Sequence, residues 1–438
     1  MPTRTARPRT AARTAAAAAL ALVAGMAPAL HPARAATAPT PAPASAPASA
    51  PAPASAPVPT PAPASAPAPD AALQRRLEQL VATPGGPPGA LVVLHRTDTR
   101  TAAGTAAGRD GGGAGRGGRT EVYRAGTADL RTGRPPRTRD HMRIASVAKA
   151  FSGAVALRLV DERRLRLDDT IGRVLPALPT AWHPVTLRRL LAHTSGLPDF
   201  SASPEFLAII TEDPRHRFDS RRLLDFVADQ GLRFTPGSRY AYSNSDNIAV
   251  ALMAEAVTGR RYETLLEQLV YRPLGLRDTH LPQGHRLPEP YLHGYAVDPP
   301  APPEDVSEAI GASGSWASGG IVSTPADLGV FIRAHAAGTL LSAETRRAQR
   351  TFVPGGASQP PGPGANDAGL ALFRYTTRCG VVYGHTGNTP GYTQLAAATP
   401  DGTRSLTFSA TSQIPLDAAL LARTRALQED FVCALLRD

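Results

Sequence analysis

Residues 144–149 read Ile-Ala-Ser-Val-Ala-Lys and place a serine three positions before a lysine, where an apolar run begins. Lys149 is the only lysine of the chain, because 46 of its 47 basic residues are arginines. Arginine stays protonated at any pH that a protein meets, whereas a lysine removed from water or placed near other cations can lose its proton near pH 7. We therefore expect Lys149 to act as a base rather than as a surface charge.

Ser146 is the group on which this base would act. Residues i and i+3 are neighbours on a helix surface, so Ser146 and Lys149 can meet if a helix begins at the serine. The hydroxyl would also lie at the positive end of the helix dipole. A neutral amine in this position can take the hydroxyl proton and make the serine a nucleophile. Ser-x-x-Lys is common by chance, but here it uses the only lysine available.

Two further motifs follow along the chain. Residues 239–244 read Arg-Tyr-Ala-Tyr-Ser-Asn, and residues 383–392 read Tyr-Gly-His-Thr-Gly-Asn-Thr-Pro-Gly-Tyr. Tyr240 and Tyr242 both precede Asn244, but only Tyr242 has the Tyr-x-Asn spacing, so Tyr242 is preferred.

These side chains need a scaffold that brings distant segments together. The hydrophobic pattern predicts helices at 71–82, 146–163 and 416–436, a helix-rich stretch at 165–275, a hairpin loop at 102–119, and strands at 90–95, 121–124, 381–383, 392–398 and 405–410. Strands at both ends around a helical middle indicate an α/β domain with an inserted helical domain. Clefts between such domains commonly hold active sites.

Ser-x-x-Lys, Tyr-x-Asn and His-Thr-Gly in this order resemble the penicillin-recognising serine hydrolases. Within that family the chain is similar to class C β-lactamases, to esterases on the same fold and, most of all, to the secreted D-alanyl-D-alanine carboxypeptidases of the Gram-positive type. The resemblance covers residues 71–438. It implies an α/β, DD-peptidase/β-lactamase-like fold in which an antiparallel sheet, formed from both ends of the chain, is flanked by helices, with a helical subdomain at about 165–310.

The resemblance also implies roles for individual residues. Ser146 would be the acylated nucleophile, Lys149 its proton acceptor, and Tyr242 a shuttle that passes the proton to the leaving amine, its pKa lowered by Lys149. Asn244 would hold the amide of the substrate. The oxyanion hole would consist of the backbone N–H groups of Ser146 and Asn388.

The third motif is expected to line the strand along which the substrate lies. His385, Thr386 and Gly387 are its candidate substrate-binding residues, and the Thr386 hydroxyl could bind a terminal carboxylate. Trp316 either walls the cleft or belongs to the core. His193, in a His-Thr-Ser-Gly-Leu turn, is interpreted as a packing residue rather than as a general base.

His385 stands where class C β-lactamases have a lysine, and histidine there is typical of the carboxypeptidase branch. That branch receives the substrate carboxylate on an arginine, and neither Arg374 nor Arg378 falls clearly in register with it.

Cys379 and Cys433 are the only cysteines, and an exported chain favours a disulfide between them, as the resemblance also does. The alternative is two buried thiols.

The N-terminal residues indicate export. Residues 1–35 combine arginines, an apolar stretch and a small-x-small site, which is typical of a signal peptide cleaved after Ala35, with an uncleaved anchor as the alternative. Residues 36–70 are a Pro/Ala/Ser-rich linker that could not bury a core. The formal net charge is +11, and five of the arginines lie in the first 35 residues. With no nucleic-acid-binding motif and no metal-binding cluster of His or Cys, we expect no nucleic acid, no metal and no cofactor.

The resulting hypothesis is a secreted, monomeric serine DD-peptidase, free outside the cell or associated with the cell wall, that removes the terminal D-Ala from D-Ala-D-Ala stem peptides of peptidoglycan. Its acyl-enzyme would form on Ser146, and penicillin or another β-lactam would acylate the same serine. One alternative is a small-ester hydrolase that uses the same residues. Another is a penicillin-binding sensor or wall-binding module with little turnover.

Overall fold

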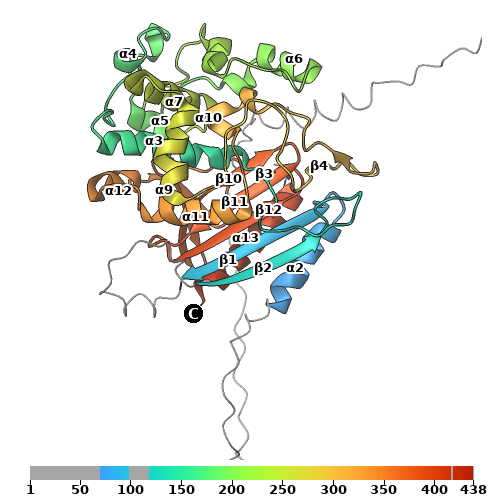
Figure 1. The fold of residues 1–438 in the computed structure, drawn as a ribbon. Coiled ribbons are helices and arrows are strands. Elements are labelled where there is room, and N and C mark those ends of the chain that lie inside the picture. The colour runs from blue at the N-terminus through green and yellow to red at the C-terminus, as the bar shows by residue number, and fades with distance from the viewer. Residues whose placement is uncertain (1–69, 98–117, 416–417, 438) are drawn as a thin grey trace, which may run out of the picture.

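The computed structural model describes residues 70–97, 118–415 and 418–437 (Figure 1). The expected signal peptide, the linker and most of the 102–119 loop lie outside the described residues. Within the described part of the chain, no helix has both the length and the apolar character needed to cross a membrane.

One antiparallel sheet of eight strands is built from both ends of the chain, as expected. Its strand order is β2-β1-β12-β11-β10-β9-β8-β7, so the N-terminal hairpin pairs with the last strand. The strands are β1 (Gly89–Thr97), β2 (Gly118–Gly126), β7 (Val353–Pro354), β8 (Ala365–Ala368), β9 (Phe373–Thr377), β10 (Gly380–Thr389), β11 (Tyr392–Ala398) and β12 (Arg404–Ala410). Short pairs are formed by β3 (Met142–Arg143) with β6 (Val322–Ser323) and by β4 (Tyr295–Ala296) with β5 (Glu304–Asp305).

Helices cover both faces of this sheet. On one face lie α2 (Ala71–Ala82) and α13 (Ala418–Leu436), and on the other lies α11 (Pro325–Ala337) (Figure 1). Strand β11 is buried along its whole length because successive side chains point to opposite faces and both faces are covered. Leu395 packs in the core beneath α13, and Ala396 packs in the core on the opposite face.

The middle of the chain forms the helical part, shown in green and yellow above the sheet in Figure 1. Its helices, with those that adjoin it, are α3 (Ala148–Asp161), α4 (Ile171–Val174), α5 (Leu187–Leu191), α6 (Pro204–Glu212), α7 (Asn244–Thr258), α8 (Tyr262–Leu266), α9 (Arg272–Leu274), α10 (Trp316–Gly319) and α12 (Ala343–Gln349). Short 3-10 turns connect several of them. The α/β fold with an inserted helical region therefore agrees with the expectation.

Two local expectations need correction. The helix expected from residue 146 begins as a 3-10 turn, Ala145–Val147, followed by α3, because the Val147 N–H donates to the Ile144 oxygen three residues before it. Residues 118 and 119, which were expected to belong to the loop, are the first residues of strand β2, since Gly118 pairs with Thr97. The hairpin itself is confirmed.

Candidate active site

Ser146 and Lys149 meet where the sheet adjoins the helical part. The Lys149 Nζ lies 3.0 Å from Ser146 Oγ, 2.7 Å from Asn244 Oδ1 and 2.7 Å from the backbone oxygen of Ser318. These partners come from the turn before α3, the start of α7 and helix α10. Lys149 is 1% exposed, although it is the only lysine of the chain.

Burial lowers the pKa of Lys149 to about 7, against the opposing effect of the carboxylates of Asp199 and Asp246. Near neutral pH a large fraction of the amine is therefore uncharged. A neutral amine has two hydrogens and one lone pair. The oxygens of Asn244 and Ser318 are carbonyl oxygens that only accept, so they take the two hydrogens. The lone pair is then left to accept the hydroxyl hydrogen of Ser146.

The backbone around Ser146 is held in an unusual conformation. Ala145 adopts a left-handed φ of 47°, which costs a non-glycine residue on the order of 1 kcal/mol and persists only where the surroundings impose it. Strand β10 passes directly beside this turn. A Cβ added at Gly387 would lie 2.3 Å from the Ile144 oxygen and 3.2 Å from the Ala145 Cβ. Glycine in the third motif therefore allows the close approach of strand and nucleophile.

Tyr242 is near the pair, as expected, but in a different protonation state. Lys149 Nζ lies 5.0 Å from the centre of its ring. The Tyr242 hydroxyl is buried and has no hydrogen-bond partner in the structure, although Ser146 is close enough to lower its pKa somewhat. Burial dominates and raises the pKa of Tyr242, so the expected lowering by Lys149 is wrong. Tyr242 stays a neutral phenol.

The Asn244 side chain, expected to hold the substrate amide, contacts protein groups at both of its polar atoms. Its oxygen accepts from Lys149, and its nitrogen donates to Asp199 Oδ2 at 3.2 Å and to Ser201 Oγ at 2.9 Å. Asp199 Oδ2 also accepts from the Asn244 backbone N–H. Both ends of the amide are thus occupied by protein groups, and Asn244 positions Lys149 instead of reaching out to a substrate amide.

His385 and Thr386 do not line an open cleft, contrary to expectation. The His385 side chain has no exposed surface, and burial lowers its pKa well below the usual value, so it is neutral. Thr386 is 1% exposed. Its hydroxyl lies 2.5 Å from the oxygen of Pro360 and 2.7 Å from Ser358 Oγ, so it is engaged by the chain itself.

Trp316 belongs to the core. Its side chain is fully buried, its indole N–H donates to Glu263 Oε1 at 3.0 Å, and its ring packs against Tyr262. It therefore does not wall the cleft. Trp316 instead supports α10, which carries the Ser318 oxygen that receives a hydrogen bond from Lys149.

Asn388 lies beside Ser146 and lines the same pocket. Its side chain donates to the Ile414 oxygen at 3.0 Å and accepts from Thr393 Oγ1 at 2.6 Å. Since the side chain is engaged by β11 and the segment after β12, only the backbone of Asn388 is a candidate for the oxyanion hole.

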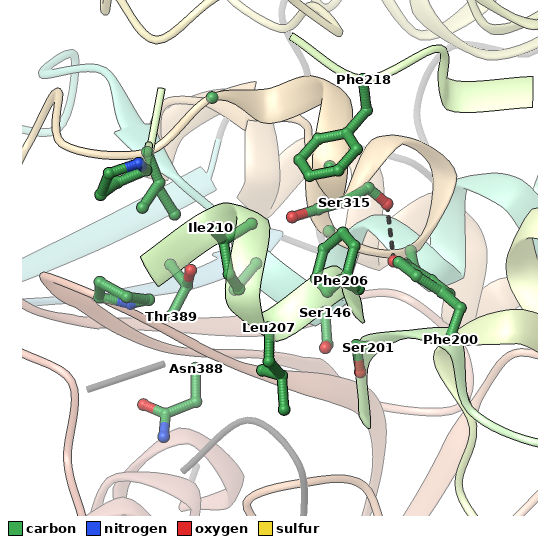
Figure 2. A pocket seen from close by; sticks show the side chains of 18 residues that line it. Ser146, Phe200, Ser201, Phe206, Leu207, Ile210, Phe218, Ser315, Asn388 and Thr389 are labelled. Atoms are coloured by element: carbon green, nitrogen blue, oxygen red, sulfur yellow. Dashed lines mark hydrogen bonds between the residues drawn. The ribbon is translucent and has the colours of Figure 1, made fainter. Parts of the chain in front are cut away.

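An apolar pocket opens at Ser146 (Figure 2). Phe206, Leu207 and Ile210 of α6 form one wall, and Asn388 and Thr389 lie on the side of β10. Phe200 and Phe218 extend the aromatic surface, with ring centres 5.2 Å and 5.0 Å from that of Phe206. The remaining lining residues are small or apolar, namely Ala145, Ser201, Pro214, Ile310, Gly311, Gly314, Ser315, Ser318, Gly319 and Pro390. None of these residues is charged.

A buried polar cluster supports the site from below. His193 Nδ1 lies 2.7 Å from Asp246 Oδ2, and the Ser195 hydroxyl donates to Asp246 Oδ1 at 2.5 Å. Burial lowers the pKa of His193 to about 3, so its imidazole is neutral and its ring packs 4.5 Å from that of Tyr242. Packing rather than base catalysis was expected of His193, and this geometry agrees.

Asp246 and Asp199 were not singled out from the sequence. The only signal for them in the sequence was their position near the Tyr-x-Asn and His-Thr-Ser motifs.

The two arginines considered for carboxylate binding have other partners. Arg374 pairs with Asp367 at 2.8 Å, and Arg378 pairs with Glu429 at 3.1 Å and with Asp430.

The expected disulfide is confirmed between Cys379, in the turn between β9 and β10, and Cys433 of α13. It therefore ties the outer end of β10 to the helix that covers the sheet.

The comparisons with known proteins agree with this geometry. A family model described as Beta-lactamase matches residues 73–430. The chain is 25% identical over 296 residues to Penicillin-binding protein 4* of Bacillus subtilis (strain 168), covering 65% of this chain and 63% of the relative. It is 35% identical over 163 residues to Esterase EstB of Burkholderia gladioli, covering 35% and 41% of the two chains. The chain thus spans less than two thirds of the length of either relative.

Among solved structures, the fold is similar to a D-stereospecific amidohydrolase from Streptomyces sp., with a TM-score of 0.66 and 30% identity. This likeness covers 82% of this chain and 98% of that chain. With a family model matched over residues 73–430, the chain belongs to the Beta-lactamase family, within the penicillin-recognising serine hydrolase superfamily.

Proposed function

We propose that this chain is a serine hydrolase that cleaves an amide bond on the carboxyl side of a D-configured amino acid, through an acyl-enzyme on Ser146. The observation that carries the proposal is the buried amine of Lys149, with a pKa of about 7, held 3.0 Å from Ser146 Oγ. Similarity to a penicillin-binding protein and to a D-stereospecific amidohydrolase supports the substrate class. Removal of the terminal D-Ala from a D-Ala-D-Ala stem peptide is one narrower form of this activity, and cleavage of a D-amino acid amide is another.

The first step forms the acyl-enzyme. Ser146 Oγ attacks the substrate carbonyl carbon while its proton passes to Lys149 Nζ. The backbone N–H groups of Ser146 and Asn388 receive the developing oxyanion. Tyr242, a neutral phenol, donates its proton to the departing nitrogen as the C–N bond breaks and takes the proton of Lys149 in return. Water then attacks the ester on Ser146, with the same groups moving its proton.

The pocket beside Ser146 would receive the side chain on the acyl part of the substrate. Its walls are apolar and aromatic, and none of its lining residues is charged. Such a surface favours an uncharged side chain and gains affinity from each apolar group that it buries. We therefore expect preference for a D-amino acid with an apolar side chain over one with a charged side chain.

Small-ester hydrolysis by the same residues is the second candidate. It is favoured by the uncharged pocket and by the similarity to an esterase. Esters are chemically easier to cleave than amides, so ester turnover alone does not distinguish the two functions.

Export through residues 1–35 and action at the cell wall as a monomer belong to the same proposal.

The decisive experiment combines covalent labelling with a substrate panel. A neutral fluorophosphonate probe is expected to label the peptide that contains Ser146, as located by mass spectrometry, and the Ser146→Ala protein serves as the unlabelled control. Turnover of D-phenylalanine amide, with little turnover of L-phenylalanine amide, is the expected result. Cleavage of short acyl esters without action on any D-aminoacyl amide or peptide would contradict the proposal and leave small-ester hydrolysis as the function.

The lysine gives a sharper prediction. Lys149→Arg keeps a cation of similar length but removes the group that can be a neutral base. Acylation by the fluorophosphonate probe is expected to slow by about 10²- to 10⁴-fold, the range of general-base assistance. The unlabelled reference is Ser146→Ala, and circular dichroism checks the fold of both variants. Acylation at the rate of the unmodified protein would remove Lys149 from the mechanism.

A further inference from the structure

The segment from Gly355 to Gly364, here named the strap, connects β7 to β8 and crosses the third motif. Strand β9 pairs with β10 only from Gly380 to Gly384, so the motif itself extends beyond the end of β9. The strap lies at this edge, which β9 leaves unpaired, because its Ser358 and Pro360 contact the Thr386 hydroxyl.

The strap engages the Thr386 hydroxyl, the group that was expected from the sequence to bind a terminal carboxylate. Thr386 Oγ1 lies 2.5 Å from the Pro360 oxygen and 2.7 Å from Ser358 Oγ, and Ser358 is 1% exposed. One hydroxyl hydrogen cannot serve the Pro360 carbonyl and an incoming carboxylate at once. A carboxylate placed here would also face the Pro360 oxygen, which only accepts hydrogen bonds and repels an anion.

Several contacts hold the strap in place. The Tyr240 hydroxyl donates to the Ala357 oxygen at 2.5 Å. Arg425 of α13 donates to the oxygens of Gly362 and Gly364 at 2.9 Å and 2.8 Å. A Cβ added at Gly362 would lie 2.3 Å from the Tyr375 ring, which shows how closely the strap packs on β9. The strap is therefore a fixed wall built on the second motif, the sheet and α13.

The position of the strap separates the two ends of the site. The apolar pocket includes Asn388, Thr389 and Pro390, which follow Gly387 along β10. Thr386 precedes Gly387, which faces Ala145 beside the nucleophile. The pocket for the acyl part and the strap thus lie on opposite sides of Ser146 along the strand. With the acyl side chain in the apolar pocket, the proposed mechanism puts the leaving group on the side of the strap.

We propose that the strap is a specificity element that selects substrates whose leaving group carries no carboxylate, such as primary amides, amide-capped peptides and esters. This inference rests on the proposed function and narrows it. Arg374 and Arg378, which could have neutralised a carboxylate, are paired with acidic side chains instead. The enzyme would act as an amidase or as a peptidase of capped peptides rather than as a carboxypeptidase.

The test compares two substrates that differ only in their C-terminus, N-acetyl-D-phenylalanyl-D-alanine and its C-terminal carboxamide. The unmodified enzyme is expected to prefer the carboxamide in kcat/KM by about tenfold or more. The reason is that the C-terminal carboxylate of the free acid would lie beside the strap without a hydrogen-bond donor or a cation to pair with. Arg425→Gln removes a strap anchor outside the pocket and is expected to reduce this preference severalfold. Arg423→Gln on the same helix, which has no bond to the strap, is the matched control and is expected to keep it.

A second readout does not depend on peptide turnover. Penicillins carry a carboxylate, so a fluorescent penicillin is expected to label the unmodified protein slowly and the Arg425→Gln and Tyr240→Phe variants faster. The neutral fluorophosphonate is expected to label all three at similar rates. Preference for the free acid, or penicillin labelling that is fast and unchanged in both strap variants, would overturn the proposal. Fluorophosphonate labelling without turnover of either peptide would instead count against the proposed function. In that case the rates of penicillin labelling would still show whether the strap disfavours a carboxylate.

Discussion

At the scale of single residues, Lys149 combines two properties that oppose each other. It is a cation by nature, yet it is 1% exposed and its pKa falls to about 7 because water cannot solvate the charged form. Arginine could not adopt the neutral state at any ordinary pH. This explains why a chain with arginine at its other 46 basic positions has a lysine here.

The pKa of Lys149 predicts the pH dependence of acylation. The protonated amine has no lone pair for the serine proton, so the reaction needs the neutral form. The rate of fluorophosphonate labelling is expected to rise with pH through a midpoint near 7 and to level off above it. Stopped-flow labelling from pH 5.5 to 9 measures this profile. A rate that falls with pH over this range would contradict the assignment of Lys149 as the base.

At the scale of elements, the site depends on how closely β10 approaches the turn before α3. That turn carries Ser146, and Gly387 is the point of contact with it. Helix α6 supplies the opposite, apolar wall of the pocket through Phe206, Leu207 and Ile210. In the proposed function strand and helix have separate tasks, since the strand would align the reacting groups and the helix would receive the acyl side chain.

Gly387→Ala tests the close approach of the strand. The new Cβ would lie 2.3 Å from the Ile144 backbone oxygen, so the strand or the turn must move. A displacement of about 1 Å at an active site can cost on the order of 10²-fold in rate, and a loss of that size is expected in fluorophosphonate labelling. Gly284→Ala, at an exposed glycine whose added Cβ meets nothing within 4 Å, is the control. Equal labelling rates in both variants would argue against the role of Gly387.

Ile210→Phe tests the wall formed by α6. The larger side chain fills part of the pocket beside Ser146, so a bulky acyl side chain loses space while a methyl group does not. We expect kcat/KM for D-phenylalanine amide to fall about tenfold relative to D-alanine amide. Ala208→Phe, on the exposed side of the same helix, is expected to leave that ratio unchanged. An unchanged ratio in Ile210→Phe would place the acyl side chain elsewhere.

At the scale of the whole molecule, two hydrophobic cores lie on opposite faces of the sheet, and the buried aromatic residues that line the Ser146 pocket belong to the first of them. One core joins the helical part to the inner face of the sheet and includes Phe151 and Trp316. The other lies between the outer face of the sheet and helices α2 and α13, and includes Phe408 and Phe431. The Cys379–Cys433 disulfide fastens the second core, because it ties the turn between β9 and β10 to α13.

Removal of this disulfide is expected to lower stability more than activity. The bond closes a loop between residues 54 positions apart, and such a crosslink typically contributes about 2–4 kcal/mol by restricting the unfolded chain. The Cys379→Ala, Cys433→Ala double variant is expected to unfold at a lower urea concentration, while fluorophosphonate labelling in the absence of urea continues. The unmodified protein with and without a reducing agent gives an independent comparison. Coinciding urea midpoints would show that the disulfide does not stabilise the fold.

Much of the fold followed from patterns that are local in sequence. The helix at 71–82 and the strand at 392–398 were predicted with the bounds that the structure has, because apolar spacing directly reflects which faces are covered. Strands β7, β8 and β9 were not predicted. They are short or follow a Pro/Gly-rich segment, and each of them adds to the strand before it in the order β10-β9-β8-β7, so their pairing depends on neighbours rather than on their own pattern.

The sequence by itself determined the reacting pair, since the serine and the only lysine are three residues apart and their chemistry follows from side-chain type. It also determined the family, through the order of three motifs. Only the tertiary structure decided which groups are buried and which hydrogen-bonding atoms are already engaged. Burial lowered the pKa of Lys149 to about 7 and kept Tyr242 a phenol, and Pro360 of the strap, 26 residues upstream, engages the hydroxyl of Thr386. Desolvation and long-range contacts depend on neighbours that are distant in sequence, so motif spacing does not encode them.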